Sequence, residues 1–78
     1  MNNRNCYLFF NGYYAVSAAS QILCRYGIEN RIVRAPVYLR DSCNFALLIN
    51  GADEQSCREL LETEKIYIEK KAYTERNV

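Results

Sequence analysis

The apolar and polar positions of this chain predict four strands of two kinds. Residues 6–10 and 44–49 are almost uninterrupted apolar runs, which are typical of strands buried on both faces. Residues 30–35 and 65–71 mix charged with apolar side chains. Such a mixture indicates half-exposed edge strands, because edge charges prevent pairing with another chain. The pattern therefore predicts two central and two edge strands.

Two helices are predicted between these strands. Residues 12–26 and 52–63 place apolar side chains at spacings of three and four, the period of an amphipathic helix. The resulting order is β-α-β-β-α-β, for which the ferredoxin-like split βαβ fold is the common arrangement. We predict an α+β domain with a four-stranded antiparallel sheet in the order 4-1-3-2 and both helices on one face. This topology puts the two apolar strands at the centre, in agreement with their composition.

A sheet covered by helices on one face leaves the other face open. In the first strand we expect Cys6, Leu8 and Phe10 to face the helices, and Tyr7 and Phe9 to face solvent, since tyrosine keeps its hydroxyl hydrated. An aromatic open face in a small protein usually has a partner. We therefore expect a weak homodimer through this face or an edge strand.

Length and composition restrict the class of protein. The 78 residues form one domain, 1–78, with an ordered core expected over about 6–71, and half of them are hydrophobic. A net charge of +1 argues against a function that binds nucleic acid by bulk charge. No apolar run approaches the roughly 18 residues of a membrane span, and the N-terminus lacks a signal-peptide pattern. We expect a cytoplasmic protein that does not enter a membrane.

The chain has four cysteines, Cys6, Cys24, Cys43 and Cys57, and no histidine. No two cysteines form a C-x-x-C pair, which excludes zinc-ribbon and thioredoxin motifs, and without histidine Cys–His catalysis in cis is excluded as well. We expect reduced thiols, no metal and no cofactor. Cys6 and Cys57 are predicted to be protected, whereas Cys24 should be exposed on its helix.

The loop formed by residues 37–43 holds the candidate functional thiol, Cys43. Loops in so small a domain often carry function. Arg40 can stabilise a thiolate, and Ser42 and Asn44 flank the cysteine as supporting loop residues. The residues alone leave two interpretations open, a reactive thiol or a half-buried side chain entering the next strand.

Six short motifs over about residues 6 to 70 match a known pattern in order. They are Tyr7-Leu8-Phe9-Phe10, Tyr26-Gly27-Ile28, Arg31-Ile32-Val33, Pro36, Ser42-Cys43 and Phe45-Ala46-Leu47-Leu48. In these motifs the chain resembles the selenium/sulfur carrier-like family, a group of small bacterial proteins. It departs from the family pattern at Val37, where arginine is typical, and at Asn44, where glycine is typical.

The resemblance implies a carrier function. In that role Cys43 would accept sulfur or selenium as a persulfide from a cysteine desulfurase-type donor and pass it to an acceptor protein. The chain would then be a carrier rather than an enzyme.

Two other functions stay open from the sequence. One is a non-catalytic binding or regulatory module that acts through its open sheet face. The other is RNA binding through Tyr7, Phe9 and Phe45, which we rank last because the basic, glycine-rich run of such modules is missing. Thiol labelling distinguishes the carrier from both, and salt-sensitive nucleic-acid binding would favour the last.

Overall fold

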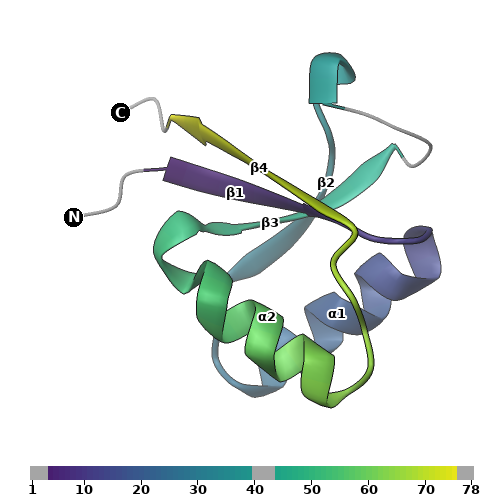
Figure 1. Ribbon diagram of the computed structural model, residues 1–78, viewed down its shortest axis with the longest axis vertical. Helices are drawn as coiled ribbons and strands as arrows, with labels where there is room; N and C mark the ends of the chain where they lie inside the picture. Colours follow the sequence, from purple (N-terminus) through teal and green to yellow (C-terminus); the bar gives the residue numbers. More distant parts are fainter. Residues whose placement is uncertain (1–3, 40–43, 76–78) are drawn as a thin grey trace.

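Two helices lie on one face of a four-stranded antiparallel sheet (Figure 1). The computed structural model describes residues 4–39 and 44–75. In chain order the elements are β1 (Arg4–Phe9), α1 (Tyr13–Arg25), β2 (Asn30–Arg34), the 3₁₀ turn η1 (Val37–Leu39), β3 (Phe45–Asn50), the 3₁₀ turn η2 (Gly51–Asp53), α2 (Glu54–Thr63) and β4 (Lys70–Glu75). The strand order is β2-β3-β1-β4. The predicted α+β, ferredoxin-like split βαβ fold is confirmed.

The two apolar strands occupy the centre of the sheet, as predicted. Strand β1 pairs with β3 on one side and with β4 on the other, and β2 completes the sheet beside β3. Leu8 lies opposite Leu47, and both are fully buried. Central strands must bury both faces, and only the two apolar segments can do so without desolvating charges.

The main core lies between the sheet and the helices. Its buried members come from both central strands, the residue that follows β1 and both helices: Cys6, Leu8, Phe10, Val16, Ala19, Ile22, Leu23, Leu47, Ile49, Cys57 and Leu61. Since α1 and α2 contribute to one continuous cluster, the helices and sheet form a single unit.

The last strand begins later than predicted. The expected strand over 65–71 is wrong for its first part, because regular pairing starts only at Lys70. Lys65 takes a left-handed backbone (φ 62°), and the amide of Ile66 donates to the Leu61 carbonyl at 2.9 Å, which closes the end of α2. Ile66 and Ile68 then pack on the main core without a strand partner. Their alternation resembles a strand pattern because both side chains face the core, although the backbone is not in the sheet.

The face of the sheet opposite the helices is half covered. Phe9, Ala35 and Ala46 form a small buried cluster there, and Tyr7, Leu39 and Ala72 pack against it. Phe9 is only 4% exposed, so the prediction that its ring faces solvent is wrong. Phe9 does lie on the predicted face, but it is buried in this cluster, against which Leu39 from the η1 turn packs, and Lys70 Nζ lies 5.0 Å from its ring centroid. Tyr7 is half-buried on this face.

Candidate functional site

The predicted site residues fall mostly in the segment between η1 and β3. Arg40, Ser42 and Cys43 lie outside the described residues. Asn44 is described and is exposed at the start of β3. The described residues on either side of this segment show its surroundings.

Both sides of the segment are attached to the sheet. The carbonyl of Leu39 accepts a hydrogen bond from Lys70 Nζ at 2.9 Å, and the Leu39 side chain packs on the cluster around Phe9. On the other side, the carbonyl of Asn44 accepts from the Ala35 amide at 2.9 Å. The two residues that border the segment, Leu39 and Asn44, are thus each held to the sheet by a hydrogen bond.

Aromatic and cationic groups surround the return point at the start of β3. The rings of Tyr13 and Phe45 meet edge to face with centroids 5.2 Å apart. The guanidinium of Arg34 lies 5.9 Å from the centroid of Phe45. Sequence reasoning missed the pairing of Tyr13 with Phe45, because it joins the first turn of α1 to a strand 32 positions away in the chain. Arg34 therefore provides a cation beside the residue that follows Asn44.

Two side chains of the η1 turn add apolar surface next to this point. Val37 is 75% exposed and Tyr38 is 79% exposed. Large apolar side chains with this exposure bury area readily when another protein docks. The chain on the N-terminal side of the candidate thiol is thus suited to protein contact.

The three described thiols differ sharply in accessibility. Cys6 and Cys57 have no exposed surface, as predicted. Burial raises the pKa of Cys6 to about 11, with a further increase from the charge of Glu54, and burial raises the pKa of Cys57 to about 12. Because the thiolate is the reactive form, both groups are chemically inert in the folded protein.

Cys24 is exposed near the C-terminal end of α1, as predicted. The side-chain amide of Asn30 donates to its sulfur at 3.6 Å and to the Ile28 carbonyl at 2.8 Å. Tyr13, which contacts the start of β3, lies at the other end of the same helix, about 16 Å away at 1.5 Å per residue. Cys24 is therefore remote from the point where the chain returns at Asn44.

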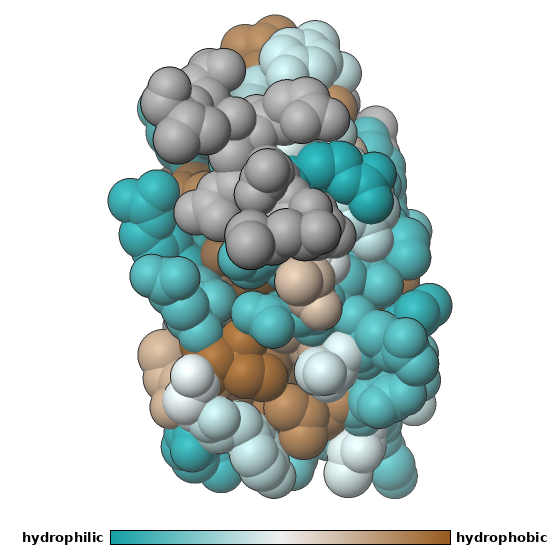
Figure 2. Space-filling view, turned by 90° about the vertical axis from the view of Figure 1, so that its left-hand side faces the viewer, coloured by the Kyte–Doolittle hydropathy of each residue, from teal (hydrophilic) through white to brown (hydrophobic). Residues whose placement is uncertain are grey.

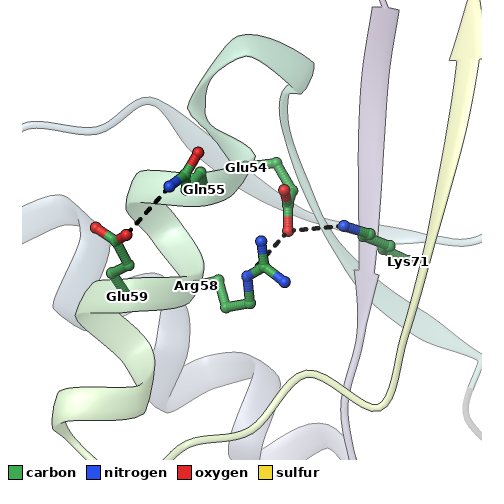
Figure 3. Close-up of polar contacts among 5 residues, drawn as sticks. All are labelled: Glu54, Gln55, Arg58, Glu59 and Lys71. Carbon is green, nitrogen blue, oxygen red and sulfur yellow. Dashed lines mark hydrogen bonds and ion pairs between the residues drawn. The ribbon is translucent and has the colours of Figure 1, made fainter.

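One buried carboxylate joins α2 to the edge strand β4 (Figure 3). Glu54 is 7% exposed, and its Oε2 lies 3.2 Å from Lys71 Nζ and 3.5 Å from Arg58 Nε. Neither contact is aligned as a hydrogen bond, so Oε2 has no hydrogen-bond partner within residues 4–39 and 44–75. The negative charge is compensated by two cations, and this arrangement attaches the start of α2 to β4.

A hollow of about 410 Å³ lies at the end of the sheet remote from Asn44. It is lined by side chains from β1, β3 and the start of β2, among them Asn5, Asn50, Arg31 and the half-buried Leu48.

Figure 2 turns the left-hand side of Figure 1, where β1 starts, toward the viewer. Its visible surface is largely hydrophilic, and its apolar side chains gather in the lower half, at the level of the helices.

Within the described part of the chain, no three Cys, Asp or Glu side chains gather in a way that would hold a metal ion. Neither α1 nor α2, the helices found between residues 4 and 75, has the length and apolar character of a membrane span.

The model of the family described as "Putative Se/S carrier protein-like" matches residues 5–72. No curated protein sequence and no solved structure matches the chain.

Proposed function

The chain belongs to the Se/S carrier protein-like family, and on that premise we propose that it carries sulfur or selenium as a persulfide or selenopersulfide on Cys43. The observation that carries the proposal is the family match itself, which spans residues 5–72 and therefore includes Cys43. The thiol inventory supports it, because burial makes Cys6 and Cys57 inert.

The transfer step needs one thiolate and a donor. The thiolate of Cys43 attacks the outer sulfur of a persulfide on the donor enzyme. A new S–S bond forms on Cys43, the S–S bond of the donor breaks, and the donor cysteine leaves as a thiolate. No external oxidant is needed, because the sulfur arrives already at the persulfide level. Transfer from Cys43 to an acceptor thiol repeats the same exchange.

The surroundings of Asn44 suit this chemistry. A neighbouring cation favours the thiolate over the thiol, and Arg34 provides a cation near the start of β3. Arg40, Ser42 and Asn44 are the supporting residues that we propose from the sequence. The exposed side chains of Val37 and Tyr38 would be covered by the donor or acceptor protein during transfer.

A cysteine desulfurase assay tests the proposal. The protein is incubated with the desulfurase and cysteine, and intact mass and peptide mapping follow the added sulfur. We expect one sulfur atom, located on Cys43, and none in Cys43→Ser. Cys24→Ser is the matched control, since it removes an exposed thiol at the far end of α1 and should leave loading unchanged.

Two results would overturn the proposal. One is loading that persists in Cys43→Ser and disappears in Cys24→Ser. The other is a folded protein that accepts no sulfur although a reporter dye labels Cys43 normally. The dye separates failure of transfer from burial of the thiol.

The expected homodimer and the cytoplasmic location stay predictions. Because Phe9 is buried, its ring is not available to a homodimer contact.

A further inference from the structure

At the end of the sheet remote from Asn44, side chains on the face opposite the helices line the hollow in known register. Asn5 of β1 and Asn50 of β3 are direct partners across the sheet, and Leu48 of β3 is the partner of Arg31 of β2. Directly opposed residues of an antiparallel pair point to the same face, with Cβ atoms about 5 Å apart. The carboxamides of Asn5 and Asn50 therefore lie beside the apolar side chain of Leu48. The guanidinium of Arg31 lies next to Leu48 on the same face.

Glu29 adds a carboxylate to the same hollow. It precedes β2 and is separated from Arg31 by one residue, a spacing that puts two side chains of an extended segment on the same face. Both are exposed, and neither forms an ion pair with any residue in 4–39 or 44–75. Opposite charges are thus available together in one hollow without being used by the fold.

The carboxamides also have unused hydrogen-bonding capacity. The Oδ1 of Asn50 accepts from the Ala52 amide at 3.0 Å, which leaves its NH₂ group to donate elsewhere. The side chain of Asn5 forms no hydrogen bond with a described residue. By contrast, the side chain of Asn30 is used by Ser20 and Ile28 and serves the fold.

From this arrangement we propose that the hollow binds a free α-amino acid. The guanidinium of Arg31 and the NH₂ group of Asn50 would hold the carboxylate, and Glu29 with the Oδ1 of Asn5 would hold the ammonium group. Leu48 would contact a small apolar part of the side chain. A zwitterion satisfies both free charges at once, whereas a simple anion or cation would leave one of them unpaired.

The site is separate from the proposed carrier thiol. β3 runs from Phe45 to Asn50, so the hollow lies about 17 Å along the strand from the end at which Asn44 returns to the sheet. Binding of an amino acid would not require Cys43, and failure of either proposal leaves the other intact.

Titration of the full chain, followed by two-dimensional NMR, tests the proposal. The probes are L-alanine, N-acetyl-L-alanine, which lacks the ammonium group, and L-alaninamide, which lacks the carboxylate. We expect L-alanine to shift the side-chain amides of Asn5 and Asn50 and the methyl groups of Leu48. Each blocked probe should bind about ten-fold more weakly, because it loses one charged pair of hydrogen bonds.

Matched variants test the two charges. Arg31→Gln and Glu29→Gln should each weaken L-alanine binding about ten-fold or more without changing the melting temperature, since both side chains are exposed. Arg25→Gln and Glu62→Gln are the controls, at exposed charges on the two helices. Cys43→Ser should bind L-alanine like the wild type.

Three outcomes would overturn the proposal. One is the absence of shifts at these residues up to about 10 mM L-alanine, beyond the weak end of specific binding. Another is equal binding of all three probes, which would show that the hollow does not recognise the ammonium and carboxylate groups of the ligand. The third is equal loss in the control variants, which would indicate a nonspecific charge effect.

Discussion

The two faces of the sheet are built from the same four strands but are stabilised in different ways. On the face toward the helices, side chains from β1, β3, α1 and α2 form one continuous buried cluster. On the other face the buried cluster of described residues is small, Phe9, Ala35 and Ala46, and Leu39 of the η1 turn packs against it. Farther along that face, the hollow beside Arg31 is open.

The two faces therefore differ in role: the helix-covered face supplies most of the stabilising core, and the other face carries the candidate functional groups. The helix-covered face holds the inert thiols Cys6 and Cys57 and most of the buried apolar side chains. The free charges, the hollow and the anchored ends of the segment around Cys43 belong to the other face and its rim. A protein of this size can expose such groups because one face alone supplies most of the burial.

Two adjacent leucines of β3 should show the difference between the two faces of the sheet most strongly. Leu47 faces the helices and has no exposed surface, whereas Leu48 faces the other side and is half-buried. Leu47→Ala should lower the free energy of unfolding by about 2–5 kcal/mol, and Leu48→Ala by about 1 kcal/mol or less. Urea denaturation measures both values. Equal losses would contradict the assignment of the two faces.

The buried thiols predict a loss of stability at alkaline pH. Folding raises the pKa of Cys6 from 9.0 to about 11 and that of Cys57 from 9.0 to about 12. Above pH 9 the unfolded chain releases these protons while the folded protein retains them, so stability is full below pH 9 and falls as pH rises toward 11 to 12. At pH 10 we expect a loss of about 1 kcal/mol for each thiol.

The pH effect is isolated by comparing variants at pH 7.5 and pH 10. Cys57→Ala should reduce the loss of unfolding free energy between these pH values by about half. Cys24→Ala, at an exposed thiol, is the matched control and should leave the loss unchanged. If Cys57→Ala and Cys24→Ala behave alike, burial of the thiol is not the cause.

The smallest effect on stability is expected for Leu39, which packs on the face of the sheet opposite the helices. Leu39→Ala should lower the free energy of unfolding by about 1 kcal/mol, because Leu39 is only partly buried against the cluster of Phe9, Ala35 and Ala46. Val37→Ala, in the same turn but 75% exposed, should change it by less than about 0.5 kcal/mol. Thermal or urea unfolding checks the pair, and a loss at Val37 as large as that at Leu39 would argue against the packing of Leu39 on this cluster.

Local pattern in the sequence predicted most of the fold. Apolar runs at 6–10 and 44–49 identified the central strands, and helical spacing identified both helices, because burial selects side chains at the period of each element. The same reasoning failed at Ile66 and Ile68, where alternation reflects packing on the core and not pairing in the sheet. Periodicity reports which side chains are buried and leaves open how the backbone is paired.

The candidate site, too, was only partly predictable from the sequence. The sequence singled out Cys43 with Arg40, Ser42 and Asn44, and of these only Asn44 lies within the described residues. The contact of Arg34 and Tyr13 with Phe45 was not predictable, since no local pattern relates these positions.

What the sequence by itself determined was the order of the elements, the central place of the two apolar strands and the protection of Cys6 and Cys57. The tertiary structure alone decided that Phe9 is buried in a cluster against which Leu39 packs, that β4 starts at Lys70, and that Asn5 and Asn50 meet beside free charges. The reason is physical: burial along one element depends on its own periodicity, whereas a cover or a hollow depends on residues that only chain folding brings together.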